Sequence, residues 1–242
     1  MSTETAAHSE GHGDHEHPEF LQHHFDTPLQ QFDAAKLGMW AFLAQEVLFF
    51  SGLFVFYGIY RNWYPEIFMY GSQLLDWRMG ATNTIVLLGS SFTAAMAVRA
   101  AQVGEGGKFG GKAWVSRFIV ITILCACAFM VIKYFEYSGK FHHGLLPGKY
   151  FNPDMAYIHD HYGLDKLPFE MRSFFGIYFM MTGVHGVHVL VGIGVFIWMY
   201  IRNAKGEFGP QFFTPIELTA LYWHLVDLIW IYLFPLLYLN LF

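Results

Sequence analysis

Ionisable side chains stand inside long apolar segments of this 242-residue sequence, and these candidates are Glu46, His185, His188, His224 and Asp227. A charge at the centre of a bilayer costs about 2.5–3.5 kcal/mol on insertion scales, so such a group needs a partner or a function. A carboxylate that faces an imidazole satisfies both groups. The same residue types also form proton routes and lipid-headgroup sites in membranes.

The spacing of these residues indicates which of them can meet. His185 and His188 are three residues apart, as are His224 and Asp227, so each pair shares one helix face. A rise of about 1.5 Å per residue places Glu46 and Asp227 about 14 Å, and His188 about 20 Å, from the same side of the membrane. Two interpretations stay open: a buried polar network that fixes helix packing, or a proton or lipid site.

The segments that must position these residues are apolar and long. The sequence is 55% hydrophobic, 19% aromatic and 14% charged, which is not typical of a soluble domain. Apolar runs that reach the roughly 20 residues of a spanning helix cover 37–60, 82–101, 113–137, 174–201 and about 216–241. The predicted fold class is all-α, a polytopic transmembrane helical bundle with five spanning helices. Residues 1–33 are predicted to form a polar, His-rich tail, and residues 34–242 a single domain.

Local signals predict details at the ends of the runs. The stretch Thr214-Pro215-Ile216-Glu217 predicts a capping box at the start of the last run. The similar Thr27-Pro28-Leu29-Gln30 predicts a short interfacial turn of helix before the first run. Arg117 and Lys133 lie near the two ends of the third run, where long side chains can extend to the lipid headgroups.

The remaining candidate ligands do not predict a metal site. Cys125 and Cys127 are two apart on a helix and project about 200° from each other, so we interpret both as packing residues. Histidines of the tail could bind a transition metal, but their glycine-rich spacing fixes no geometry and favours a solvated tail. These histidines are His8, His12, His15, His17, His23 and His24.

Two further patterns concern neighbours and orientation. Small residues mark close helix contacts in lipid, and whether these contacts are internal or with a partner stays open. They are Ser90, Ser91, Ala94 and Ala95 on the second run, and Gly176, Gly183, Gly186, Gly192 and Gly194 on the fourth. Lys and Arg are equally frequent on both sides, but the short basic connection 102–112 favours an amino terminus inside the cell.

A haem-carrying membrane cytochrome is an alternative of a different functional class. A helical bundle can hold haem b through one histidine from each of two helices. His185 or His188 with His224 would supply such a pair. Asp227 offers His224 a simpler partner, so we favour the polar network.

Ordered segments of the sequence resemble the haem-copper respiratory oxidase subunit III family. They are GMWAFLAQEVLFFSG, NTIVLLGSS, KYFEY, GVHGVHVLVG and LYWHLVDLIWIYLFPLLYL. The resemblance covers about residues 37–241 and is similar to the five-span form of bacterial members, whereas many members have seven spans. It implies a subunit without metal or haem of its own, packed directly against subunit I, which carries the haem and copper, beside subunit II and other respiratory-chain subunits.

The resemblance also implies positions of interest. Glu46 matches the membrane-buried glutamate of the family, His185 and His188 its H-x-x-H helix, His224 and Asp227 its W-H-x-x-D segment, Asn83 and Thr84 its N-T motif, and Glu136 and Tyr137 its E-Y motif.

The function implied is support of aerobic electron transport rather than catalysis. Members are expected to bind phospholipid, to keep proton uptake by subunit I efficient and to protect the active site. Cytochrome c oxidase is favoured, with quinol oxidase or an accessory subunit of a nitric oxide reductase as alternatives. The expected location is the bacterial cytoplasmic membrane, with the carboxyl terminus outside. No catalytic residue, metal site or nucleic-acid partner is predicted for this chain.

Overall fold

A computed structural model describes residues 21–147, 150–163, 167–168 and 170–239. Five helices in this part of the chain are long and apolar enough to cross a membrane. They are α1 (Pro28–Trp63), α3 (Trp77–Val103), α4 (Lys112–His142), α6 (Met171–Ala204) and α7 (Thr214–Tyr238). The prediction of an all-α bundle with five spans is therefore confirmed.

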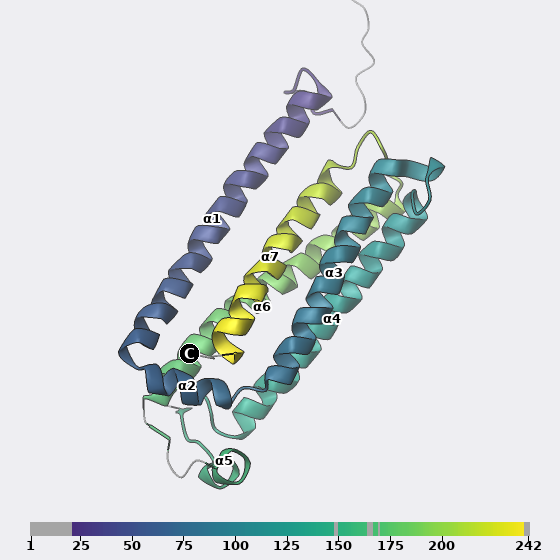
Figure 1. Ribbon diagram of the computed structural model, residues 1–242. Coiled ribbons are helices and arrows are strands. Elements are labelled where there is room, and N and C mark those ends of the chain that lie inside the picture. Colours follow the sequence, from purple (N-terminus) through teal and green to yellow (C-terminus); the bar gives the residue numbers. More distant parts are fainter. Residues whose placement is uncertain (1–20, 148–149, 164–166, 169, 240–242) are drawn as a thin grey trace, which may run out of the picture.

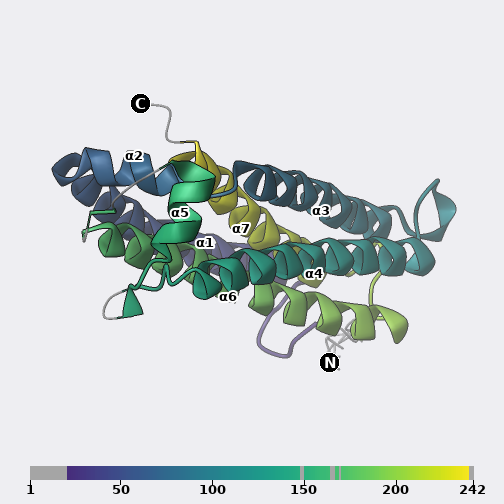
Figure 2. The ribbon, with the colours of Figure 1, turned by 90° about the horizontal axis from the view of Figure 1, so that it is seen from below.

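The helices form one bundle in which α7 is central. Helix α7 packs against α3 and α6, α4 packs against α3 and α6, and α1 lies at the edge of the bundle, where it contacts α7 (Figure 1). We call the end where α1 and α7 begin the amino-terminal end, and the opposite end the carboxyl-terminal end. The short helices α2 (Pro65–Gln73) and α5 (Met155–Tyr162) lie at the carboxyl-terminal end (Figures 1 and 2).

Several connections were not predicted from the apolar runs. Helix α2 packs against α6 and α1, and a 3-10 turn, η1 (Gly104–Gly106), follows α3. Asp76 caps α3 and Asp154 caps α5, because each carboxylate accepts a hydrogen bond from a backbone N–H two or three residues later. These elements are too short for a hydropathy pattern to identify.

The helix starts correct two predictions. The Thr27 hydroxyl accepts from the backbone N–H of Gln30 at 3.2 Å, but it caps the whole of α1 and not a separate interfacial turn. Helix α1 therefore begins inside the segment predicted as tail. At α7 the N-cap is Phe213 without a side-chain hydrogen bond, so the predicted capping box is wrong. Glu217 is drawn away by Lys36 of α1, with 3.0 Å between Nζ and Oε1.

Close helix approach is confirmed at only part of the predicted small residues. A Cβ atom on Gly192 would stand 2.5 Å from the ring of Trp223, so α6 and α7 need a glycine there. Gly186 and Gly194 face open space, and these two positions are free of internal packing. Cys127 is exposed and Cys125 half-buried, so the interpretation of Cys127 as a packing residue is wrong within this chain. Of the tail histidines, His8, His12, His15 and His17 lie outside the described residues.

Candidate functional site

The Glu46 carboxylate of α1 meets the His188 imidazole of α6, two residues that the sequence placed in one rough layer without pairing them. Glu46 Oε2 and His188 Nε2 are 3.0 Å apart, and His188 Nδ1 lies 2.8 Å from the Val184 carbonyl oxygen. A carbonyl can only accept, so Nδ1 carries a hydrogen. The contact at Nε2 then holds one shared proton, on the carboxyl group or on the imidazole. We call this pair the Glu46 site.

The surroundings of the Glu46 site leave one edge open. The Phe50 ring packs at 5.0 Å from the His188 ring, and the Tyr222 hydroxyl donates to the His188 carbonyl at 2.9 Å. The side chains of Glu46 and His188 nevertheless keep 12% and 19% exposure. The pair is therefore internally satisfied but reaches the surface between α1 and α6.

His224 and Asp227 do not form the predicted pair. The Ser91 hydroxyl of α3 lies 2.6 Å from His224 Nδ1. The Asp227 carboxyl group is buried, and among the described residues no hydrogen-bond partner satisfies it, although Ser91 approaches it. Three residues along a helix rotate a side chain by about 300°, which is enough to turn Asp227 into the core while His224 stays half-buried.

His185 is separated from the other two membrane histidines. It is fully buried, and the rings of Phe129 and Trp230 lie 5.6 and 5.2 Å from its imidazole. Neither ring nitrogen has a hydrogen-bond partner within the described part of the chain. Both ring nitrogens of His188 and Nδ1 of His224 make contacts inside the bundle, and His185 packs between two aromatic rings, so the structure does not bring two of these imidazoles together as a haem pair.

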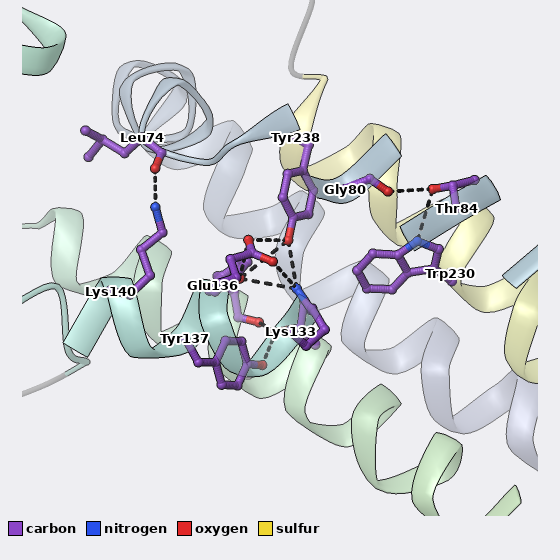
Figure 3. Close-up of polar contacts among 11 residues, drawn as sticks. Leu74, Gly80, Thr84, Lys133, Glu136, Tyr137, Lys140, Trp230 and Tyr238 are labelled. Carbon is purple, nitrogen blue, oxygen red and sulfur yellow. Dashed lines mark hydrogen bonds and ion pairs between the residues drawn. The ribbon is translucent and has the colours of Figure 1, made fainter. Parts of the chain in front are cut away.

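The N-T motif contributes one interhelical contact. Thr84 donates to the Gly80 carbonyl at 2.9 Å and accepts from the indole N–H of Trp230 at 3.1 Å (Figure 3). Asn83 is fully buried, and its amide has no partner among the residues that the structure describes. Thr84 therefore joins α3 to α7.

A second polar cluster lies near the carboxyl-terminal end and was not predicted as a unit. Glu136 accepts from Lys133 Nζ at 2.9 Å, from the Tyr178 hydroxyl at 2.8 Å and from the Tyr238 hydroxyl at 2.6 Å. Lys133 Nζ also donates to the Tyr238 hydroxyl at 2.8 Å and lies 4.9 Å from the centre of the Trp230 ring. Figure 3 shows how these side chains converge from α4 and α7. We call Lys133, Glu136, Tyr178 and Tyr238 the Lys133 cluster.

The Lys133 cluster corrects the prediction that Lys133 extends to the headgroups. Lys133 is 6% exposed and Glu136 5%, and Lys133 lies nine residues, or about 14 Å, from the end of α4. Glu136 is one turn away on the same helix face. The K-x-x-E spacing in an apolar run was the available signal for this pair. Arg117, in contrast, is exposed and lies over the Trp114 ring.

Two neighbouring contacts extend the cluster toward the surface. The Tyr137 hydroxyl lies 2.5 Å from the Thr182 hydroxyl, so the E-Y motif joins α4 to α6 at both residues. Lys140 Nζ donates to the carbonyl of Leu74 after α2. The carboxyl-terminal end is therefore held together by polar contacts among four helices.

The candidate residues that the structure describes make polar contacts between helices rather than a cluster of metal ligands. Within the described residues, no set of three or more His, Cys, Asp or Glu side chains is placed to hold a metal ion. The candidate positions instead form hydrogen bonds between helices, which fits a structural or proton-related role.

Comparison with known proteins gives consistent relatives. The cytochrome c oxidase subunit III family matches residues 165–240. A probable cytochrome c oxidase subunit 3 of Mycobacterium tuberculosis is 31% identical over 215 residues, which is 87% of this chain and 90% of the relative. The cytochrome c oxidase subunit 3 of Corynebacterium diphtheriae is 32% identical, with 87% and 90% covered. A quinol oxidase subunit 3 of Bacillus subtilis is 28% identical, with 84% and 85% covered.

Proposed function

Because the chain belongs to the cytochrome c oxidase subunit III family, we propose that it is the non-redox subunit III of a terminal oxidase that receives electrons from cytochrome c. It spans the bacterial cytoplasmic membrane with its amino-terminal end toward the cytoplasm. It packs against subunit I, which carries the haem and copper and reduces oxygen, and it assembles with subunit II.

The Glu46 site is the observation that carries this proposal. Its single shared proton and its open edge suit a group that accompanies proton uptake by a neighbouring subunit. The pair needs no other partner, because the carboxyl group and the imidazole satisfy each other. Its role is then to hold and orient one proton at Glu46 Oε2 and His188 Nε2, while the redox chemistry stays on subunit I.

A quinol donor is the second candidate, since quinol oxidase subunits of Bacillus cover 84% of this chain. The experiment is to purify the native complex through a tag on this chain. Oxygen consumption with reduced cytochrome c, but not with a quinol, is the expected result. Activity with quinol alone would favour the second candidate, and a chain that purifies without any haem-containing subunit would contradict both.

Phospholipid binding is the second part of the proposal, and a groove at the amino-terminal end supports it. A cavity of about 620 Å³ between α1, α6 and α7 is lined by Phe32, Trp198, Arg202 and Phe213. A further cavity of about 260 Å³ shares Leu218 with the first and is almost wholly apolar. Arg202 Nε is already paired with Glu207 Oε2 at 2.6 Å, so a phosphate would use the terminal nitrogens of the guanidinium, with acyl chains along the apolar continuation.

Lipid retention tests this groove. Arg202→Gln is expected to reduce the amount of phospholipid that remains on the purified complex in native mass spectrometry, because glutamine lacks the guanidinium that would contact the phosphate. Arg117→Gln is the matched control, since Arg117 is exposed on α4 outside the groove. Equal lipid content in both variants would contradict the proposed site.

A further inference from the structure

One half-buried imidazole of the spans lacks a complete set of partners. His224 contacts Ser91 through Nδ1, and the opposite nitrogen, Nε2, is not enclosed and has no hydrogen-bond partner among the described residues. His224 lies ten residues after the start of α7, about 15 Å along the helix axis. This depth is near the middle of a hydrocarbon core that is about 30 Å thick.

The other imidazole that reaches the surface of the bundle provides a contrast. His188 is 19% exposed at its side chain, but Glu46 satisfies its Nε2 atom. Lipid tails offer no hydrogen-bonding group at mid-bilayer, so a polar atom that faces them stays unsatisfied at a cost of several kcal/mol. His224 Nε2 therefore needs a group from outside this chain.

The surface around His224 is a mostly apolar stripe along α7. Leu221, His224, Leu228, Ile231 and Pro235 recur every three or four residues and form the α7 face, a side of α7 whose side chains are half-buried at Leu221 and His224 and exposed further along. Leu228 and Ile231 are 49% and 42% exposed. Helices α1 and α3 flank this helix and α6 lies behind it (Figure 1).

The edge of α3 beside this face consists of short or apolar side chains. Ser91 and the exposed Ala95 lie one turn apart, and Leu88 is 49% exposed. Small side chains allow a neighbouring helix to approach closely in lipid, where packing and single hydrogen bonds drive association. An apolar face with one unsatisfied nitrogen at its centre matches that kind of partner.

We propose that the α7 face is the surface on which a transmembrane helix of the oxidase docks, and that this helix presents a hydroxyl, amide or carboxyl group to His224 Nε2. The inference rests on the proposed function, which supplies the oxidase subunits as partners. A hydroxyl suits either tautomer of the imidazole, because it can both donate and accept. Ser91 acts as a positioning residue that holds the ring through Nδ1.

Photo-cross-linking of the intact complex in membranes tests the surface. A photoreactive amino acid replaces Leu228 on the α7 face, and in separate variants it replaces Leu190 of α6 or Leu124 of α4. The two controls are leucines with 54% and 63% exposure on other helices. The expected result is an adduct with another transmembrane subunit from position 228 and none from the two controls.

The opposite pattern would overturn the docking surface. If position 228 yields only lipid adducts while Leu190 or Leu124 positions yield subunit adducts in an intact complex, the partner docks elsewhere and the proposed function stands. If the chain carries no other oxidase subunit at all, the proposed function fails first. The two failures are thus distinguishable.

Substitution of the imidazole gives an independent measurement. His224→Phe keeps the ring volume and removes the nitrogen, so the apparent Kd for re-association with the stripped complex should rise about three- to twentyfold. His224→Gln keeps a hydrogen-bonding group and should restore most of the affinity. Equal affinity of His224→Phe and the unsubstituted chain, with unchanged thermal unfolding of both, would contradict the role of Nε2.

Discussion

Breaking the ion pair of the Lys133 cluster should destabilise the bundle far more than removing the whole pair. Lys133→Met leaves Glu136 buried without its cation, and Glu136→Gln leaves Lys133 without its anion. Removal of one partner from a buried pair typically costs about 3–5 kcal/mol, whereas replacement of both is often nearly neutral. The 5% and 6% exposures of Glu136 and Lys133 place the pair in this regime.

The magnitude for the double variant follows from the contacts that survive. In Lys133→Met with Glu136→Gln, the amide oxygen still accepts from Tyr178 and Tyr238, which now approach Oε1 at 2.8 and 2.6 Å. Only the ion pair and the hydrogen bonds that Lys133 donates are lost. We therefore expect the double variant to be more stable than the sum of the single effects by about 2–3 kcal/mol.

The free energy of unfolding of the purified chain in mixed micelles is the quantity to measure. An SDS titration followed by circular dichroism gives it for the four members of the cycle. Arg117→Met is the control on the same helix, and its effect should stay within about 0.5 kcal/mol because Arg117 is exposed. Additive effects of the two single substitutions would refute the pairing, whatever their size.

Two further predictions concern the Glu46 site and the contact between α6 and α7. Glu46→Gln should leave assembly intact, because the amide keeps the shape of the carboxyl group. Proton pumping or the number of turnovers before inactivation should change, because the proton shared with His188 is lost. Failure of assembly would show a purely structural role. Gly192→Leu should destabilise the chain by about 1–3 kcal/mol in the same titration, because the Trp223 ring occupies the space. Gly194→Leu faces open space and should have no such effect.

The five spans were predictable because membrane insertion selects long apolar runs, and hydropathy reports them directly. The helix ends were less predictable. Thr27 does cap a helix, as its side chain predicted, but that helix continues without a break into the first span. At the start of α7, Glu217 pairs with Lys36 of α1 instead of capping its own helix. A contact between helices that are far apart in the sequence thus overrides a local pattern.

The candidate site was predictable in part, because a buried carboxylate requires a hydrogen-bonding partner such as an imidazole. The depth estimate placed Glu46, His188 and Asp227 in one rough layer without naming a partner for Glu46, and the structure shows that the partner is His188. The predicted partner was wrong for His224, because Ser91 on α3 is a partner that sequence spacing within α7 cannot reveal. Serine is common in spans, so its presence alone carries little information about a specific contact.

The three polar sites differ in how completely the hydrogen bonds of the described residues satisfy them. The Lys133 cluster is buried and its ammonium and carboxylate meet each other. The Glu46 site reaches the surface, but its two groups also meet each other. His224 alone among these reaches the surface with one nitrogen still unpaired in the described part of the chain. Since hydrocarbon cannot supply a hydrogen bond, the unpaired nitrogen of His224 is the reason why we propose the α7 face, and not the other two sites, as the docking surface.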